Sequence, residues 1–514
     1  MKKHALICSF FFLVFATGFS QPTKESLEKY KVLSQKVLAH FESQPKKKKA
    51  AQFLLRGMLN HGSANPQWID KNKKASNLSE FKYESFSAAK HAFNAFIAQG
   101  GKQDIKFVRD LDQLTSDFLI KHIDYSFKTW EESPWYKSYS FDYFCEYVLP
   151  YRSSIEPLEN NWKQKYAQLY KSALFTASDP KDPVSVCSEL IKSVKHLQFI
   201  NKRAYPQPML SADQVHFRGQ GNCTDLANTV LLLGRALGLG VTYDFTPYHA
   251  ASSHSHYWNT VLDKDCNFIP FNGNGELPYV YNAATKRLGK VLRQTFSPQK
   301  EALATKVPSK QIPTIKLMKP NVIDVTEQYV YVSNVSYKFD EKIPNNIAYI
   351  AVFNKAKWQP TWWASTDANH NAIFKNMGRN IVYLPSKTKD TILHKVKRTI
   401  LDLEKYAILL KSNGEQRLLK PDFKNTFNAT ISRANEETFG YNDFNTVTFK
   451  EDKNYTLYYW EGKWKAFKKV KSINASLSFK GLPKNALFKV LPDDPDTFER
   501  IFVIDPKTQK IFWY

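Results

Sequence analysis

A cysteine, a histidine and a carboxamide follow one another in an order that suits thiol chemistry. Cys223 stands on a glycine-flanked turn directly before an apolar, helix-like run. His256 lies on a later strand-like run, and Asn272 ends the next one. A thiol nucleophile needs a base within hydrogen-bond reach and a third group to orient that base. We therefore take Cys223 as the candidate nucleophile, His256 as the base and Asn272 as the orienting group.

The position of Cys223 favours an activated thiol. Unpaired backbone N–H groups and the helix dipole at a helix N-terminus stabilise a thiolate. The same N–H groups can form an oxyanion hole. Gly221 and Asn222, directly before the cysteine, are small enough to let a substrate backbone approach. Taken alone, Cys223 fits a buried structural cysteine equally well, so the histidine decides between the two interpretations.

His256 is the best candidate for the base. In an extended run it shares one face with Trp258, which can keep its ring dry and oriented. His249 and His254 are alternatives on what reads as a loop, where surface histidines are typical. For the third group, Asp263 and Asp265 are alternatives to Asn272, but carboxylates in a turn usually form the turn itself.

The elements around these residues predict an α+β core. The helix that starts at Cys223 has an apolar face and ends at Gly238. Strands are expected at residues 239–245, 256–262 and 266–271, and a helix at residues 184–199 should pack against the first helix. One helix followed by an antiparallel meander is typical of the α+β class.

The region before the core reads as helical. A helix is expected after the cap at residues 115–117, and a shorter one between Ser140 and Pro150 that buries Cys145. Just beyond it, Tyr151, Arg152 and Glu156 fit either a groove or, as we favour, a buried ion pair.

Beyond Asn272 the pattern changes to β-structure. Residues 282–320 read as a long connection, and strands are expected at residues 329–332, 347–352 and 381–384. Hairpins are expected at residues 455–467 and 501–514. We interpret this half as β-sandwich modules. Its tryptophans fit either sandwich cores, the favoured interpretation, or platforms that stack on sugar rings; they are Trp358, Trp362, Trp363, Trp460, Trp464 and Trp513.

The length of the chain indicates how many domains it forms. A chain of 514 residues is expected to form several domains. We place a signal peptide at residues 1–20, a helical region at 21–180, the core at 181–318, a β-sandwich module at 319–415 and a C-terminal β-rich module at 416–514. The basic start and short apolar run of the first segment are typical of a secretory signal, too short to span a membrane. An exported protein, periplasmic or extracellular, is therefore expected.

Net charge and the number of cysteines limit which partners, metals and cofactors the sequence suggests. The formal net charge of +25 favours polyanionic neighbours such as an anionic envelope. The lysines are scattered and form no nucleic-acid motif, so no nucleic-acid partner is expected. The four cysteines outside the signal are too few for a disulfide framework and lack metal-ligand spacing. No metal, cofactor or transmembrane segment is expected.

Around the candidate site the sequence resembles the transglutaminase-like superfamily. The resemblance rests on residues 221–225, 234–238, 256–258 and 270–272: Gly-x-Cys-x-Asp, Gly-Arg-Ala-Leu-Gly, His-x-Trp and a strand-ending Pro-x-acid element. It implies a papain-like Cys-His-Asp triad made by Cys223, His256 and Asn272, with an amide in place of the usual carboxylate. It also implies a likeness to large secreted bacterial proteins, which join a helical region to β-rich modules.

Two functions follow as expectations. The first is an exported cysteine enzyme that acts on amide bonds of peptide or peptidoglycan-type substrates through a thioester, with water as the default acceptor. The second is a catalytically weakened transglutaminase-like domain that binds glycan or peptide in the envelope. The choice between them depends on Asn272. An amide stabilises an imidazolium less than a carboxylate does, which favours the weakened domain.

Overall fold

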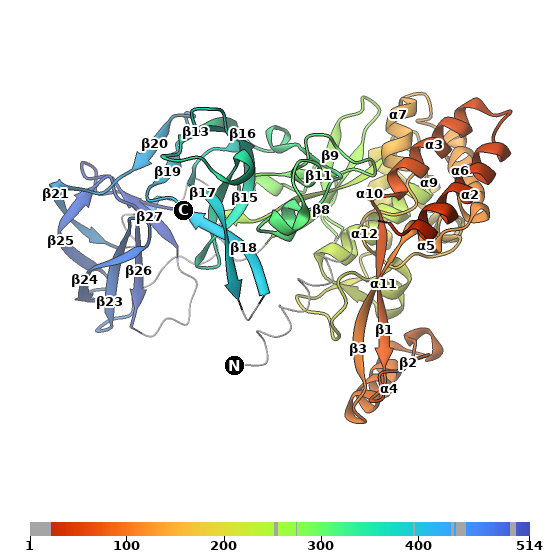
Figure 1. Ribbon diagram of the computed structural model, residues 1–514, viewed down its shortest axis with the longest axis horizontal. Coiled ribbons are helices and arrows are strands. Elements are labelled where there is room, and N and C mark those ends of the chain that lie inside the picture. The colour runs from red at the N-terminus through yellow and green to blue at the C-terminus, as the bar shows by residue number, and fades with distance from the viewer. Residues whose placement is uncertain are drawn as a thin grey trace.

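The computed structural model describes residues 22–250, 255–273, 275–393, 396–432, 436–437, 449–493 and 500–514. The expected signal peptide and His254 lie outside these residues. The molecule is elongated: helices gather at one end, β-sheets at the other, and the mixed core lies between them (Figure 1). None of the described helices is long and apolar enough to cross a membrane.

Helices α2, α3 and α6 form the N-terminal layer, at the right of Figure 1. Their bounds are Lys24–His40, Pro45–Met58 and Ser116–Glu132. Thr115 caps α6 by accepting a hydrogen bond from the N–H of Phe118, as the sequence predicts. The short helix after Ser140 is present too, as α7 (Phe141–Tyr143) continued by the π-helix η2 (Phe144–Val148). Cys145 is buried within it.

An arm of β-structure interrupts the region that was expected to be helical. Strands β1 (Gly62–Ile69) and β3 (Lys102–Arg109) pair along their whole length. Between them lie β2 (Ala75–Ser76) and α4 (Phe86–Ala98), and the arm projects away from the body (Figure 1). No residue of β3 is fully buried. A strand that is solvated on both faces shows no apolar alternation, so the sequence pattern does not reveal it.

The core is the expected α+β arrangement. Helix α12 (Cys223–Ala236) is buried on all sides between a sheet and helix α8 (Trp162–Tyr170), and α10 (Pro183–Ser193) packs nearby. The sheet has the order β12-β11-β6-β8-β9. Strands β6 (Val241–Thr246), β8 (His256–Leu262) and β9 (Phe268–Phe271) form the predicted antiparallel meander. Gly238 ends the helix with a φ of +79°, a conformation that disfavours other residues.

The segment at residues 282–320 is more than a connection. It supplies β11 (Leu292–Gln294), which pairs with β6, and β11 in turn pairs with β12 (Val322–Asp324). Both strands have only three residues. A run that short carries no readable period, which is why the sequence indicates a loop there.

A buried ion pair fastens the helical layer to the base of the arm. The Arg152 Nε lies 2.7 Å from an Asp110 carboxylate oxygen, and both side chains are fully buried. Tyr151 donates a hydrogen bond of 2.9 Å to the same carboxylate. The predicted ion pair is therefore present, but Asp110 rather than Glu156 is its acid. The Glu156 carboxylate instead accepts hydrogen bonds from the N–H groups of Ser153 and Ser154.

The C-terminal half consists of two β-modules. The first pairs β13 with β16 and builds the sheet β15-β14-β17-β19-β20, with β18 beside β17. Its strands are β13 (Val332–Lys338), β14 (Ile347–Asn354), β15 (Lys357–Ser365), β16 (Asn371–Gly378), β17 (Ile381–Leu393), β18 (Val396–Leu403), β19 (Ala407–Leu410) and β20 (Gln416–Leu419). The strand expected at residues 329–332 is wrong, because β13 starts only at Val332.

The second module pairs β21 with β25 and builds the sheet β22-β28-β27-β26-β23-β24. Both predicted hairpins are present. The strands are β21 (Asp422–Ile431), β22 (Glu436–Glu437), β23 (Asn454–Trp460), β24 (Trp464–Lys471), β25 (Leu477–Lys484), β26 (Phe488–Pro492), β27 (Ile501–Ile504) and β28 (Ile511–Trp513).

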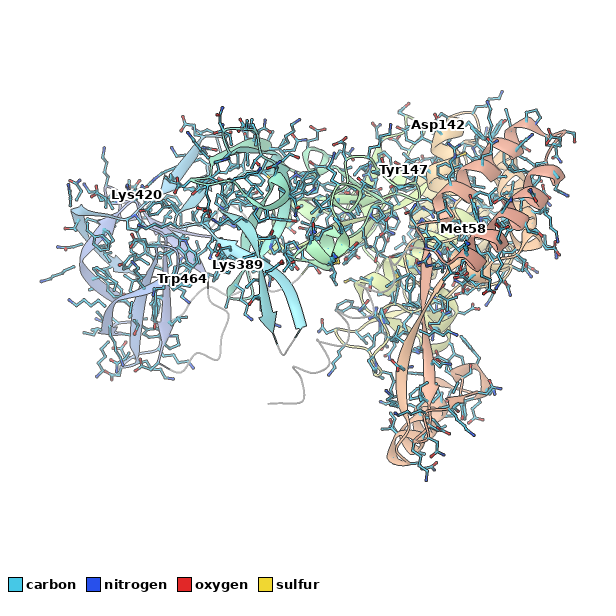
Figure 2. All side chains as sticks on the ribbon, in the orientation of Figure 1. Met58, Asp142, Tyr147, Lys389, Lys420 and Trp464 are labelled. Atoms are coloured by element: carbon cyan, nitrogen blue, oxygen red, sulfur yellow. The ribbon has the colours of Figure 1, made fainter. Side chains whose placement is uncertain are left out.

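Side chains confirm the favoured interpretation of the tryptophans. Trp358, Trp460 and Trp513 are buried in the modules or between them, and Trp363 is buried against the α+β core. Lysines dominate the outside of these modules instead; Lys389 and Lys420 are exposed examples (Figure 2).

Candidate active site

Cys223 is held at the first position of α12 by a dense set of polar contacts. The Asn222 side chain accepts hydrogen bonds from the N–H groups of Thr224 (3.0 Å) and Asp225 (3.2 Å). The Asp225 carboxylate accepts one from the N–H of Asn222 and two from the Arg203 guanidinium. A Cβ on Gly221 would lie 2.7 Å from the Cβ of Asp225, so only glycine fits there. Gly221 and Asn222 therefore shape the helix start around the thiol.

The resting thiol differs from the thiolate that the helix start alone favours. Burial raises the pKa of Cys223, although the backbone N–H of Tyr257 and the Lys316 ammonium oppose the shift. Desolvation disfavours the charged form of any thiol, and here it outweighs the helix terminus. Cys223 is therefore mostly protonated at neutral pH and needs a base to become a nucleophile.

His256 meets the requirements of that base. It begins β8, and its ring centroid lies 5.7 Å from that of Trp258. Burial, helped by the Lys286 ammonium, lowers the pKa of His256 to about 4. The imidazole is therefore neutral at pH 7 and can accept a proton. Trp258 is fully buried and donates a hydrogen bond of 2.9 Å to the Tyr329 hydroxyl, so it supports the strand rather than contacting a substrate.

Cys223 and His256 have neighbouring residues in common. The backbone N–H that lowers the pKa of Cys223 belongs to Tyr257, the residue after His256. Tyr281 is a neighbour of both: its ring centroid lies 6.3 Å from that of His256, and its pKa is raised by burial and then by the charges of Glu276 and Cys223. Sequence reasoning missed Tyr281, because it lies in a segment without a readable motif.

His249 corrects one expectation. It lies on the short strand β7 (His249–Ala250), which pairs with β10 (Arg287–Leu288), and it is only 2% exposed. The expected surface position is therefore wrong. Its ring centroid is 6.4 Å from that of His256, so it belongs to the surroundings of the candidate base.

Asn272 directly follows β9 and lies on the same side of the sheet as His256. The pairing of Asn259 with Phe271, continued by one residue, places Asn272 opposite Trp258 and diagonal to His256. Its carboxamide donates a hydrogen bond of 2.9 Å to the Glu276 carboxylate. Among the described residues no hydrogen bond joins it to the His256 ring, so its orienting role stays a prediction. Asp263 forms a turn, as expected, by accepting from the N–H groups of Asp265 and Asn267.

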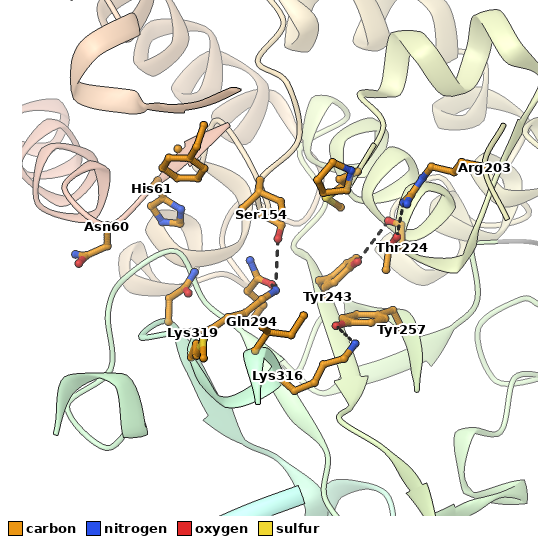
Figure 3. A pocket seen from close by; sticks show the side chains of 18 residues that line it. Asn60, His61, Ser154, Arg203, Thr224, Tyr243, Tyr257, Gln294, Lys316 and Lys319 are labelled. Atoms are coloured by element: carbon orange, nitrogen blue, oxygen red, sulfur yellow. Dashed lines mark hydrogen bonds between the residues drawn. The ribbon is translucent and has the colours of Figure 1, made fainter. Parts of the chain in front are cut away.

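A cavity of about 250 Å³ lies beside the thiol. Its walls include Thr224 from the start of α12, Tyr243 from β6 and Tyr257 from β8 (Figure 3). Lys316, Lys319 and His61 approach it from the other side. Three of its lining residues, Thr224, Tyr257 and Lys316, interact with Cys223, and the space is large enough for a small part of a substrate.

The burial of His61 gives a testable dependence of stability on pH. Its ring stacks on Phe296 at 4.5 Å, and burial lowers its pKa to about 3. Since the unfolded histidine takes up a proton near pH 6.5, the unfolded state gains protons as the pH falls from 6.5 towards 3, and stability falls with it. Between pH 7.5 and 4.5 this histidine should cost about 2–3 kcal/mol.

Urea unfolding at the two pH values measures this effect. A His61→Phe variant should lose correspondingly less stability on acidification than the wild type, whereas replacing the exposed His91 in the same way should change nothing. An identical pH dependence in the wild type and His61→Phe would contradict a neutral buried imidazole.

Comparison with known proteins identifies the core. Residues 175–273, which contain Cys223, His256 and Asn272, match the transglutaminase-like superfamily. None of the curated protein sequences matches the chain significantly.

Two solved structures show a distant likeness. One is a candidate cysteine protease from Cytophaga hutchinsonii, with 19% identity over 23% of this chain and 42% of that one and a TM-score of 0.19. The chain thus matches less than half of that protein's length. The other is red sea bream transglutaminase, with 9% identity over 69% of this chain and 73% of that one and a TM-score of 0.23.

Proposed function

We propose that this chain, whose residues 175–273 form a transglutaminase-like core, is an exported cysteine enzyme that cleaves amide bonds of peptide or peptidoglycan-type substrates. The observation that carries the proposal is that a protonated, half-buried Cys223 and a neutral, half-buried His256 share Tyr281 as a neighbour. A weak acid beside a base that can take its proton is what nucleophilic thiol catalysis requires.

The reaction runs in two halves. His256 takes the proton from Cys223 Sγ as the sulfur attacks the amide carbon, and the carbonyl oxygen becomes an oxyanion. The N–H of Cys223, at the first position of α12, has no intrahelical partner and is a suitable donor to that oxyanion. Collapse breaks the C–N bond, His256 returns the proton to the leaving amine, and a thioester remains. His256 then takes a proton from water as the water oxygen attacks the thioester carbon. The C–S bond breaks, the acid leaves, and His256 returns the proton to Cys223 Sγ.

Export and hydrolysis are the finer parts of the proposal. The basic and apolar start of the sequence supports export. Hydrolysis is the default because the sequence offers no dedicated site for an amine acceptor. The high positive charge suits a substrate within an anionic envelope.

A second function, binding without turnover, is favoured by one observation. Asn272 replaces the family's carboxylate, and its amide donates to Glu276. A triad without a carboxylate stabilises the imidazolium less, which suits a retired enzyme that still holds peptide or glycan.

Mass spectrometry of a peptide library incubated with the full chain separates the two functions. We expect water to replace the leaving amine in some peptides, with no product from a Cys223→Ala variant. If an added primary amine is incorporated instead, the acceptor is an amine rather than water. Binding of peptides by both proteins with turnover by neither would overturn the enzyme proposal in favour of the second function.

A further inference from the structure

The cavity beside Cys223 carries an unbalanced positive charge. The Lys316 ammonium donates to the Tyr257 hydroxyl (2.9 Å) and to Ser255 (3.1 Å), as Figure 3 shows for Tyr257. The Lys319 ammonium donates to the Gln294 amide oxygen (2.8 Å) and lies 3.4 Å from the Ser154 hydroxyl. None of the four acceptors is a carboxylate. Within the described part of the chain, neither lysine forms an ion pair with a carboxylate.

The other cavity residues do not restore the balance. The residues that line the cavity include no aspartate or glutamate. Arg203 is already neutralised by two hydrogen bonds to Asp225, outside the lining. Glu156, whose charge acts on Lys319, is already engaged by the N–H groups of Ser153 and Ser154. The two ammonium groups therefore face the cavity without an anion.

Several buried cations elsewhere in this protein are paired with a carboxylate, although, among the described residues, Lys163 and Arg235 donate only to a hydroxyl and to backbone carbonyls. Arg152, Arg293 and Lys290 each hold a carboxylate, from Asp110, Asp244 and Asp324 respectively. A cation removed from water without a counter-charge is unfavourable. Burial, reinforced by the charge of Lys316, accordingly lowers the pKa of Lys319 to about 7. An anion in the cavity would relieve this cost and return Lys319 to its charged form.

We propose that the cavity binds a carboxylate of the substrate between Lys316 and Lys319, next to the amide that Cys223 attacks. The inference rests on the proposed function and adds its substrate class. Apolar walls from Met209, Ile315 and Met318 suit a short aliphatic stem behind the carboxylate. The carboxylate is either an acidic side chain or a free C-terminus within about one residue of the scissile amide.

A pair of alkylating reagents tests the charge at the thiol without any knowledge of the substrate. The Cys223 thiolate displaces iodide from both iodoacetate and iodoacetamide. The two reagents differ only in that iodoacetate carries a carboxylate where iodoacetamide carries a neutral amide. Since both attack the same thiolate, the ratio of their rates cancels the ionisation of the thiol. We expect the iodoacetate-to-iodoacetamide ratio at Cys223 to exceed that of free glutathione about tenfold or more, as charge-assisted hydrogen bonds allow.

Variants assign the effect to the two lysines. Lys316→Met and Lys319→Met should each move the ratio towards that of glutathione, whereas Lys300→Met, an exposed lysine of the same segment, should leave it unchanged. The ratio should also fall as the pH rises through about 7, because Lys319 then loses its proton. The iodoacetamide rate in each variant shows whether the site remains folded.

The outcomes separate this inference from the proposed function. A Cys223 that reacts with iodoacetamide but shows the glutathione ratio overturns the carboxylate site and leaves the nucleophile intact. A Cys223 that reacts with neither reagent overturns the proposed function, and the substrate inference with it.

Peptides then identify the source of the carboxylate. Calorimetry on the Cys223→Ala protein would compare a library substrate with a free C-terminus, its C-terminal amide, and a form with glutamate changed to glutamine. If the amidated peptide binds about tenfold or more weakly, the carboxylate is the C-terminus; if the glutamine peptide does, it is the side chain. Equal affinity for all three contradicts the site.

Discussion

Replacing His256 with alanine should lower kcat/KM on any amide substrate by at least about 10³-fold, while substrate affinity changes little. The reason is the resting state of the pair. Burial raises the pKa of Cys223, so the thiol cannot supply its own thiolate at neutral pH. In the proposed mechanism His256 is the group that takes this proton. The wild-type rate should also fall below about pH 4, where the imidazole becomes protonated.

Steady-state kinetics on the best peptide from the library measures this loss, with Cys223→Ala as the zero-activity reference. His249→Gln is the matched control, because His249 is a buried neighbour of His256 on a different strand. It should keep most of the activity. Similar losses in the two histidine variants would mean that His256 acts through the fold and not as the base.

Changing Asp110 to asparagine should lower the free energy of unfolding by about 3–5 kcal/mol. The carboxylate is fully buried and accepts from Arg152 and from the Tyr151 hydroxyl. Its removal leaves a buried guanidinium without a counter-charge, which is more costly than the pair itself is favourable. Because Arg152 also donates to the Gly62 carbonyl at the base of the arm, the loss should loosen the arm as well.

Urea unfolding followed by circular dichroism measures the change. Asp124→Asn is the control: Asp124 pairs with Lys47 at 2.7 Å, but its side chain is 42% exposed. That variant should lose no more than about 1 kcal/mol. If the two variants are equally stable, the Arg152–Asp110 pair does not fasten the arm to the body.

The central elements were predictable because each carries its own periodic signal. The run from Cys223 to Gly238 has a cap at one end and a glycine at the other, and α12 follows it closely. Strand β8 has the predicted bounds, and the turn at Asp263 fixes β9 beside it. The positions of Cys223 and His256 could therefore be inferred from local patterns alone.

What surrounds the site could not be inferred in this way. Lys316 and Lys319 lie in the segment at residues 282–320, which the sequence indicates as a connection, and Tyr281 directly precedes it. Only tertiary packing brings these residues to the thiol. The same packing reverses the expected state of Cys223, since the depth of burial outweighs the helix terminus. The partner of Asn272 was equally hidden, because Glu276 follows a turn with no distinctive pattern.

The most direct test of the Cys223–His256 pair is the rate of Cys223 alkylation by iodoacetamide as a function of pH, in the wild type and in His256→Ala. We predict that wild-type Cys223 reacts faster than Cys266 at pH 7 and loses its reactivity only towards pH 4, where His256 becomes protonated. In His256→Ala the rate at pH 7 should fall at least about tenfold and recover only at alkaline pH. Equal rates for Cys223 and Cys266, unaffected by the loss of His256, would contradict the pair.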